Sequence, residues 1–208
     1  MKWRINPNGR TVGEYWSDVD KTVIYPELVS FGVDVKSIPV KAWSELPESH
    51  VYGAAAGTLF KELTPKKLWP RLFPSNDTLI LVSSDAVNIA YPTNEDKYVM
   101  LVHELAHVRQ AIMGALGDVN VGVLFYNVPH ERDALRWMAK QGKHMGWSEQ
   151  RLQRLIRNRY VGHGPRGTRT ILQETQLGFK LDPRQDTLTL LQRRPVFVRH
   201  HHRRKQRG

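Results

Sequence analysis

The motif HELAH, residues 103–107, places two histidines and a glutamate inside the otherwise apolar run YVMLVHELAHVRQAIMG. Apolar residues such as Leu101 and Leu105 recur through this run at the spacing of one helix face, so the run predicts a helix. Residues four apart lie one above the other on a helix, and His103 and His107 therefore point the same way. Their imidazoles can hold one metal ion as adjacent ligands, so the motif predicts a metal site on a largely apolar helix.

Glu104 lies one residue further round this helix, where it can reach the open coordination position and take a proton from bound water. Zinc lowers the pKa of such a water to about 7, which makes a hydroxide nucleophile available at neutral pH. The chain has no cysteine, so a transition-metal site must use histidine and carboxylate ligands. The alternative is two histidines at a chance helical spacing. The apolar surroundings of the motif and the presence of further ligand candidates favour the metal site.

Candidates for a third ligand lie in NVPHERDALRWM, residues 127–138, and they are His130, Glu131 and Asp133. On a helix, Glu131 shares its face with the apolar residues Ala134, Leu135 and Met138. A carboxylate on an apolar face is costly unless it is paired or binds a metal. Asp133 falls on another face, where a solvated ion pair accounts for it; the other members of that face are Arg136, Trp137 and Lys140. His130 begins the helix and could line the cleft. Glu131 is therefore the favoured third ligand.

The order HELAH followed by ERDA resembles the gluzincin branch of the zincin metallopeptidases. More closely, HELAHVRQ…NVPHERDA resembles small bacterial and phage zincin-like domains, over roughly residues 77–142. Metzincins are excluded, because Gln110 and Met113 stand where that class has a glycine and a third histidine. The resemblance implies a zincin-like α+β domain.

The same resemblance implies which residues carry the chemistry. It places Zn²⁺ on His103, His107 and Glu131, with Glu104 as the general base. It also implies an edge strand above the site that binds an extended peptide substrate, here either TLILV or NIAYP.

One departure from the gluzincin pattern concerns the support of the metal ligands. Many gluzincins have an aspartate four residues after the third ligand, which orients a zinc-bound histidine, and this chain has Leu135 there. Ligating histidines usually donate their second N–H to an acceptor, so that acceptor must come from elsewhere. A donor for the developing oxyanion is also needed, and the candidates by position are Tyr126, His130, Tyr160 and His163.

The order of secondary structure predicts a small mixed or antiparallel sheet packed on the active-site helix. Residues 22–29, 33–43, 77–84 and 88–92 are rich in β-branched or aromatic residues between turn formers, which favours strands. Residues 50–60, HVYGAAAGTLF, suit either a helix or a strand.

Helices dominate the second half of this domain. The active-site helix is expected to begin with a capping box of Thr93 and Asp96 and to end at Gly114. The ligand-bearing helix is expected to run from Pro129 to just before Gly142. A third helix, capped by Ser148, completes a predicted domain over residues 1–160.

The remaining residues, 161–208, form a predicted basic extension, with a β-hairpin followed by a disordered tail. Residues 151–208 hold 15 Lys/Arg and 3 Asp/Glu, a balance of +12, whereas residues 1–150 hold 16 and 17, a balance of −1. This asymmetry predicts a segment that binds nucleic acid or another polyanion. The residues at its end that would do so are Arg193, Arg194, Arg199, Arg203, Arg204, Lys205 and Arg207.

These features together predict a zinc metalloendopeptidase that acts on a peptide or protein substrate, directed to nucleoprotein by its basic tail. The alternative is a catalytically weak or inactive zincin scaffold with a structural or nucleic-acid-binding role, for example a phage component. No apolar run approaches the roughly 20 residues that cross a bilayer, and MKWRINPNGR lacks the features of a secretory signal. We therefore expect no membrane partner and a cytoplasmic location, with association with a virion as the alternative.

Overall fold

Helices and one small sheet make up the part of the chain that the computed structural model describes, which is residues 2–42, 56–61, 66, 69–73, 76–114 and 129–159. Two of the helices, η1 and η2, are 3-10 helices. In chain order the elements are α1 (Val12–Tyr15), η1 (Val19–Lys21), α2 (Tyr25–Ser30), η2 (Val35–Ser37), β1 (Val40–Ala42), β2 (Ala56–Phe60), α3 (Trp69–Leu72), β3 (Thr78–Val82), α4 (Ser84–Ala90), α5 (Asn94–Ile112), α6 (Pro129–His144) and α7 (Glu149–Arg159).

The sheet is mixed and has the strand order β1-β3-β2. Strand β1 pairs in parallel with β3, with Val40 opposite Ile80, and β2 pairs antiparallel with β3, with Thr58 also opposite Ile80. The predicted strand in residues 77–84 is confirmed as β3, but TLILV is the middle strand and not an edge. Its position explains its continuous apolar sequence: Ile80 faces the main core, whereas Leu79 and Leu81 pack in a second cluster with Leu72 and Phe73 of the α3 region.

Two predicted strands are wrong. Residues 22–29 contain helix α2, in which Pro26 lies in the first turn, where its fixed φ suits a helix and its missing N–H costs no hydrogen bond. Residues 88–92, NIAYP, lie at the end of helix α4 and just after it. Val87 and Tyr91 are buried while Ile89 is 84% exposed, which is the pattern of a helix face and not of a strand.

One further strand prediction was partly right. The described residues of the range 33–43 form the 3-10 helix η2 and then strand β1. Of the ambiguous segment 50–60, the last five residues form β2.

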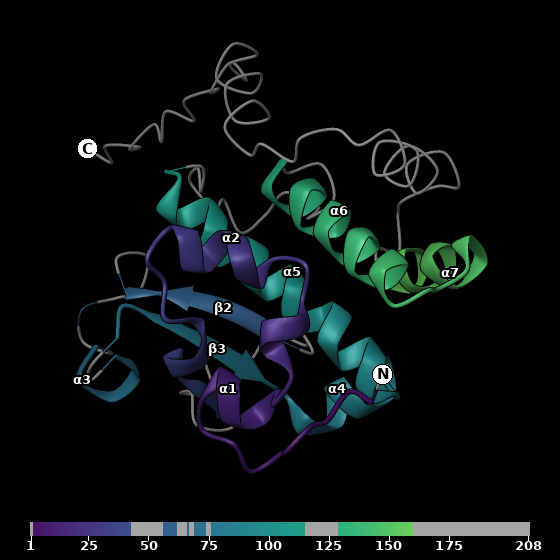
Figure 1. Ribbon diagram of the computed structural model, residues 1–208. Helices are drawn as coiled ribbons and strands as arrows, with labels where there is room; N and C mark the ends of the chain where they lie inside the picture. The colour runs from purple at the N-terminus through teal and green to yellow at the C-terminus, as the bar shows by residue number, and fades with distance from the viewer. Residues whose placement is uncertain are drawn as a thin grey trace, which may run out of the picture.

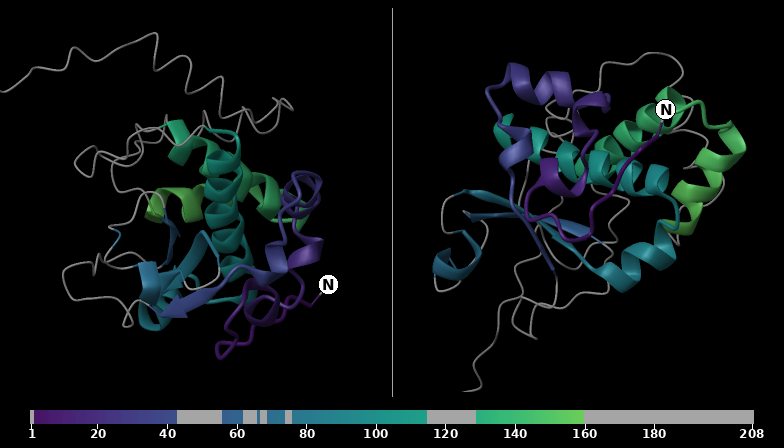
Figure 2. Two further views of the ribbon diagram at one scale, coloured as in Figure 1. Left: turned by 90° about the vertical axis from the view of Figure 1, so that its left-hand side faces the viewer. Right: turned by 60° about the horizontal axis from the view of Figure 1, so that its bottom comes forward.

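Helix α5 is buried along almost its whole length. Its predicted capping box is confirmed, since the Thr93 side chain accepts from the Asp96 N–H and the Asp96 side chain accepts from the Thr93 N–H. The helix ends at Ile112, and Gly114 follows with a φ of +65°, a conformation that glycine adopts without strain. Figures 1 and 2 show α5 running through the middle of the described part, with the sheet on one side and α6 alongside it.

Helix α6 continues past the predicted stop at Gly142 and ends at His144. Gly142 instead lies where α7 approaches closely, because a Cβ there would lie 2.3 Å from Leu152 Cδ2 and the leucine side chain would have to shift. The turn to α7 is made at Gly146, which has a φ of +77°. The predicted third helix is confirmed as α7, and the Ser148 hydroxyl accepts from the backbone N–H of Arg151 at 3.3 Å. The predicted extension, residues 161–208, lies outside the described residues.

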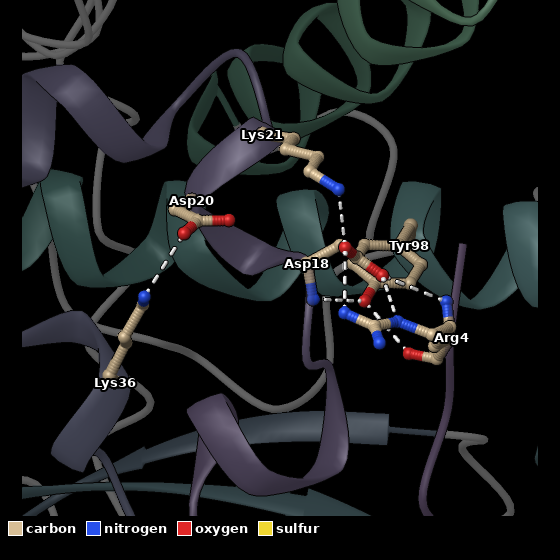
Figure 3. A network of polar contacts seen from close by, with 6 residues as sticks. All are labelled: Arg4, Asp18, Asp20, Lys21, Lys36 and Tyr98. Carbon is tan, nitrogen blue, oxygen red and sulfur yellow. Dashed lines mark hydrogen bonds and ion pairs between the residues drawn. The ribbon is translucent and has the colours of Figure 1, made fainter. Parts of the chain in front are cut away.

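A polar network around Asp18 ties the amino-terminal segment to α5 (Figure 3). The Asp18 carboxylate, 3% exposed, accepts hydrogen bonds from Lys21 Nζ at 2.5 Å and from Arg4 Nε at 3.2 Å. The backbone N–H of Asp18 donates to the Tyr98 hydroxyl of α5 at 2.8 Å, and that hydroxyl donates to the Arg4 carbonyl at 2.9 Å. Residues far apart in the sequence are therefore held together on one side of the helix that carries the HELAH motif.

We expect this network to make folding stability depend on pH. Burial opposes ionisation of Asp18, but the hydrogen bonds from Lys21 and Arg4 outweigh it and hold the pKa at about 2, against an ordinary 3.8. The ionised carboxylate therefore stabilises the fold above about pH 4, and this contribution is lost as the pH falls through 4 to about 2. The substitution Asp18→Asn should lower the free energy of unfolding by about 1 kcal/mol at pH 7, since solvent screens the exposed ends of both cations.

The measurement is urea unfolding at pH 7 and pH 3, with a smaller difference between the two pH values in Asp18→Asn than in the wild type. The control is Asp20→Asn, because Asp20 pairs with Lys36 at 3.1 Å with both side chains nearly half exposed. That variant should stay within about 0.5 kcal/mol of the wild type. Equal losses in the two variants would show that the buried carboxylate has no special role.

Candidate metal centre

Two histidines of α5 and one glutamate of α6 come together in the structure. His103 Nε2 and His107 Nε2 are 3.2 Å apart, and the carboxylate oxygens of Glu131 lie 3.3 Å from His103 Nε2 and 3.5 Å from His107 Nε2. The three side chains are each about one-tenth exposed. The two carboxylate distances belong to different oxygens, Oε2 facing His103 and Oε1 facing His107. With one ligand atom from each residue, the three atoms lie within 4.8 Å of one another, and the group could hold a metal ion.

The packing of α6 on α5 brings Glu131 to the two histidines. Ala134, Leu135 and Met138 are at most 1% exposed, and they share a helix face with Glu131. This apolar face packs along α5, so the carboxylate at its end is directed to the same helix. The facing argument made from the sequence was thus correct for Glu131.

Glu131 is held in its charged form by its neighbours. Burial opposes ionisation of this carboxyl, but the imidazoles of His107 and His103 outweigh it and hold its pKa well below the ordinary value. Burial also lowers the pKa of His130 to about 4, helped by repulsion from His107. At neutral pH the cluster therefore offers one carboxylate, and the nearby His130 is an uncharged imidazole.

The side chain that contacts the second nitrogen of His107 is Gln110, one turn further along α5. Its Oε1 lies 2.9 Å from His107 Nδ1. Its Nε2 donates to the backbone carbonyl of His130 at 2.7 Å and to Asp133 Oδ2 at 2.9 Å. Sequence reasoning recognised that Leu135 could not supply this acceptor but did not find Gln110; the available signal was its position three residues after His107, on the same helix face.

The prediction that Asp133 lies on a solvated face is wrong. Asp133 is fully buried, and Trp137 is 2% exposed. The face is covered because α6 packs against more than α5: its Gln141 Oε1 accepts from the backbone N–H of Val23 at 2.9 Å. Of the four residues predicted on this face, only Lys140 is exposed. Its Nζ lies 4.5 Å from the centre of the Trp137 ring.

The candidate general base Glu104 contacts the sheet. It is 5% exposed. The hydroxyl of Thr58, in the middle of β2, lies 2.8 Å from Glu104 Oε2 and 3.1 Å from the Glu104 carbonyl oxygen. A single hydroxyl hydrogen can serve only one of these oxygens at a time. Sequence reasoning missed Thr58, because the pairing spans 46 residues and β2 itself was ambiguous.

Of the four candidates for stabilising an oxyanion, the structure places His130 beside the cluster. Its ring centre is 5.8 Å from that of His107, and its Nε2 is 3.8 Å from Glu131 Oε1. Tyr126, Tyr160 and His163 lie outside the described residues. The predicted polyanion-binding residues of the tail, from Arg193 to Arg207, also lie outside them.

Comparison of the chain with protein-family models, with curated proteins and with solved structures finds no match. Among the described residues, no helix has both the length and the apolar character needed to span a membrane.

We expect Glu131→Ala to lose the metal that the wild type binds, because removal of one of three ligands leaves two imidazoles that cannot enclose an ion. Both proteins should carry glutamine in place of the three consecutive histidines His200, His201 and His202, so that the tail cannot contribute. Metal content would be measured by mass spectrometry after dialysis, with about one equivalent expected in the parent and less than about a tenth in the variant. The control is Glu149→Ala on α7, which should bind as the parent does. Equal content in the parent and Glu131→Ala would refute the site.

Proposed function

We propose that this chain is a zinc-dependent metalloendopeptidase, with His103, His107 and Glu131 as zinc ligands and Glu104 as general base. The observation that carries the proposal is the cluster of His103, His107 and Glu131, whose ligand atoms lie within 4.8 Å of one another, on and beside the helix that also carries Glu104. The resemblance of HELAH…ERDA to gluzincins supports the same assignment.

The donor set favours zinc over magnesium and calcium. Two imidazoles and one carboxylate form a set that catalytic zinc sites use, with a fourth position left for water or substrate. Ligand atoms about 2.0–2.1 Å from a tetrahedral zinc ion lie about 3.3–3.5 Å from one another. The His103 Nε2–His107 Nε2 distance of 3.2 Å is close to this spacing, and each imidazole has one carboxylate oxygen of Glu131 within 3.5 Å. Magnesium and calcium prefer sites made of oxygen ligands alone, so an imidazole pair argues against them.

When bound, zinc supplies a Lewis acid that polarises a peptide carbonyl and acidifies a water molecule. Glu104 takes the proton from the attacking water and returns it to the leaving amine. Thr58 holds the Glu104 carboxylate through Oε2, which leaves the other oxygen for proton transfer. His130, an uncharged donor beside the cluster, is the stabiliser of the oxyanion.

The strand that binds the substrate in this proposal is β2, and not TLILV or NIAYP as expected from the sequence. Among the described strands, only β3 pairs with β2, so β2 lies at the edge of the sheet. It is half-buried and joins the site through Thr58. An extended peptide can add to such an edge through main-chain hydrogen bonds, which would bring its carbonyl groups past Glu104.

The alternative of an inactive scaffold rests on the basic tail and on the absent aspartate at Leu135. The missing aspartate counts for less here, because Gln110 Oε1 lies 2.9 Å from His107 Nδ1. A carboxylate at Glu104, buried and hydrogen-bonded, is also costly to retain without a use. We therefore favour the peptidase.

The first test is Glu104→Gln. The amide keeps the size of the side chain but cannot accept a proton, so cleavage of an unfolded protein substrate should fall by about 100-fold or more while bound zinc is unchanged. Glu149→Gln, an exposed glutamate on α7, is the matched control and should cleave at the wild-type rate. Wild-type cleavage by Glu104→Gln would overturn the mechanism.

The basic tail is the basis of a second test. If residues 151–208 direct the enzyme to nucleoprotein, a DNA-bound protein should be cut faster than the same protein free in solution at about 50 mM salt. The advantage should disappear at about 200 mM salt and in a variant with glutamine at Arg203, Arg204, Lys205 and Arg207, because each lost phosphate contact weakens binding. Equal cleavage of free and DNA-bound substrate by the wild type would remove this role.

A further inference from the structure

We infer that Gln110 is a positioning residue that locks His107 in the tautomer with hydrogen on Nδ1, and that α6 holds this lock in place. The inference rests on the proposed function in one respect: it takes His107 Nε2 to be a metal ligand. It concerns a different property, the state of the ligand before any metal binds.

The orientation of the Gln110 amide follows from its surroundings. A glutamine amide has an oxygen that accepts and an NH₂ group that donates. The two groups within 3 Å of Nε2 are the His130 carbonyl oxygen, at 2.7 Å, and Asp133 Oδ2, at 2.9 Å. A backbone carbonyl oxygen can only accept, so the group that faces the His130 carbonyl must be the NH₂ group. A flipped amide would set an oxygen against two oxygens, so the NH₂ group must face α6.

The tautomer of His107 follows from that orientation. With its NH₂ group toward α6, Gln110 presents Oε1 to His107 Nδ1 at 2.9 Å. Because an amide oxygen only accepts, Nδ1 must carry the hydrogen. A neutral imidazole with hydrogen on Nδ1 has its lone pair on Nε2. That nitrogen lies 3.2 Å from His103 Nε2 and 3.5 Å from Glu131 Oε1, so the lone pair is available where the other ligands converge.

The same hydrogen bonds position the third ligand. The two acceptors on α6, His130 and Asp133, stand one residue before and two residues after Glu131. Gln110 thus holds the turn of α6 that carries the carboxylate while it orients the imidazole. Gln110 and Asp133 are both fully buried, so water cannot easily take the place of either. This arrangement also gives the buried Asp133 side chain a hydrogen-bond donor.

The test reads the tautomer directly. Wild-type protein stripped of metal with a chelator would be studied by long-range ¹H–¹⁵N NMR at pH 8, where the two imidazole nitrogens of His107 are distinguished by their shifts. We expect the Nδ1–H form alone. In Gln110→Met, which keeps the size of the side chain without its hydrogen bonds, we expect both tautomers and a zinc affinity lowered about 10- to 100-fold.

Gln153→Met is the matched control, since Gln153 on α7 donates to the exposed Glu149 at 3.0 Å, on a helix that does not carry the cluster. It should change neither tautomer nor affinity. An Nε2–H form or a mixture in the wild type would overturn the inference, as would an unchanged tautomer and affinity in Gln110→Met. If Gln110→Met does not fold, the wild-type spectrum still decides.

The result is independent of peptidase activity. A failed Glu104→Gln test with the expected tautomer would overturn the proposed function alone. A mixed tautomer in a wild type whose cleavage depends on Glu104 would overturn this inference alone.

Discussion

The burial of α5 is the constraint on which the rest of the structure depends. The helix is covered along nearly its whole length, so water cannot satisfy its polar side chains and each needs a partner on a neighbouring element. Tyr98 bonds to the amino-terminal segment, Glu104 to β2, Arg109 to Glu27 of α2, and Gln110 to α6. The polar groups of one helix thus specify where four other parts of the chain pack.

This arrangement links stability to the candidate metal centre. An unsatisfied buried donor or acceptor costs about 1–3 kcal/mol, so the packing that completes these hydrogen bonds is strongly favoured over near alternatives. The packing of α6 against α5 satisfies Gln110 and at the same time brings Glu131 to the two histidines. The contacts that pack α6 on α5 are therefore the same contacts that set the positions of the candidate metal ligands.

Helix α6 shows where reasoning from a single sequence is dependable and where it is not. Helical spacing correctly assigned Glu131 to the apolar face that meets α5. The same spacing led to the wrong prediction that Asp133 faces solvent, because that prediction took only one face of the helix to be covered. The amino-terminal segment also packs on α6, through Val23 and Gln141. More of the surface of α6 is therefore buried than the sequence pattern indicates.

What the sequence by itself determined is local. The capping box of α5, the shared direction of His103 and His107, and the apolar face that includes Glu131 all follow from the geometry of one helix, which is the same in any fold. Only the tertiary structure decided that Thr58 meets Glu104, that Gln110 joins His107 to Asp133, and that residues 88–90 belong to a helix. These features depend on contacts between elements far apart in the chain, and no spacing within one element encodes which partner will be near.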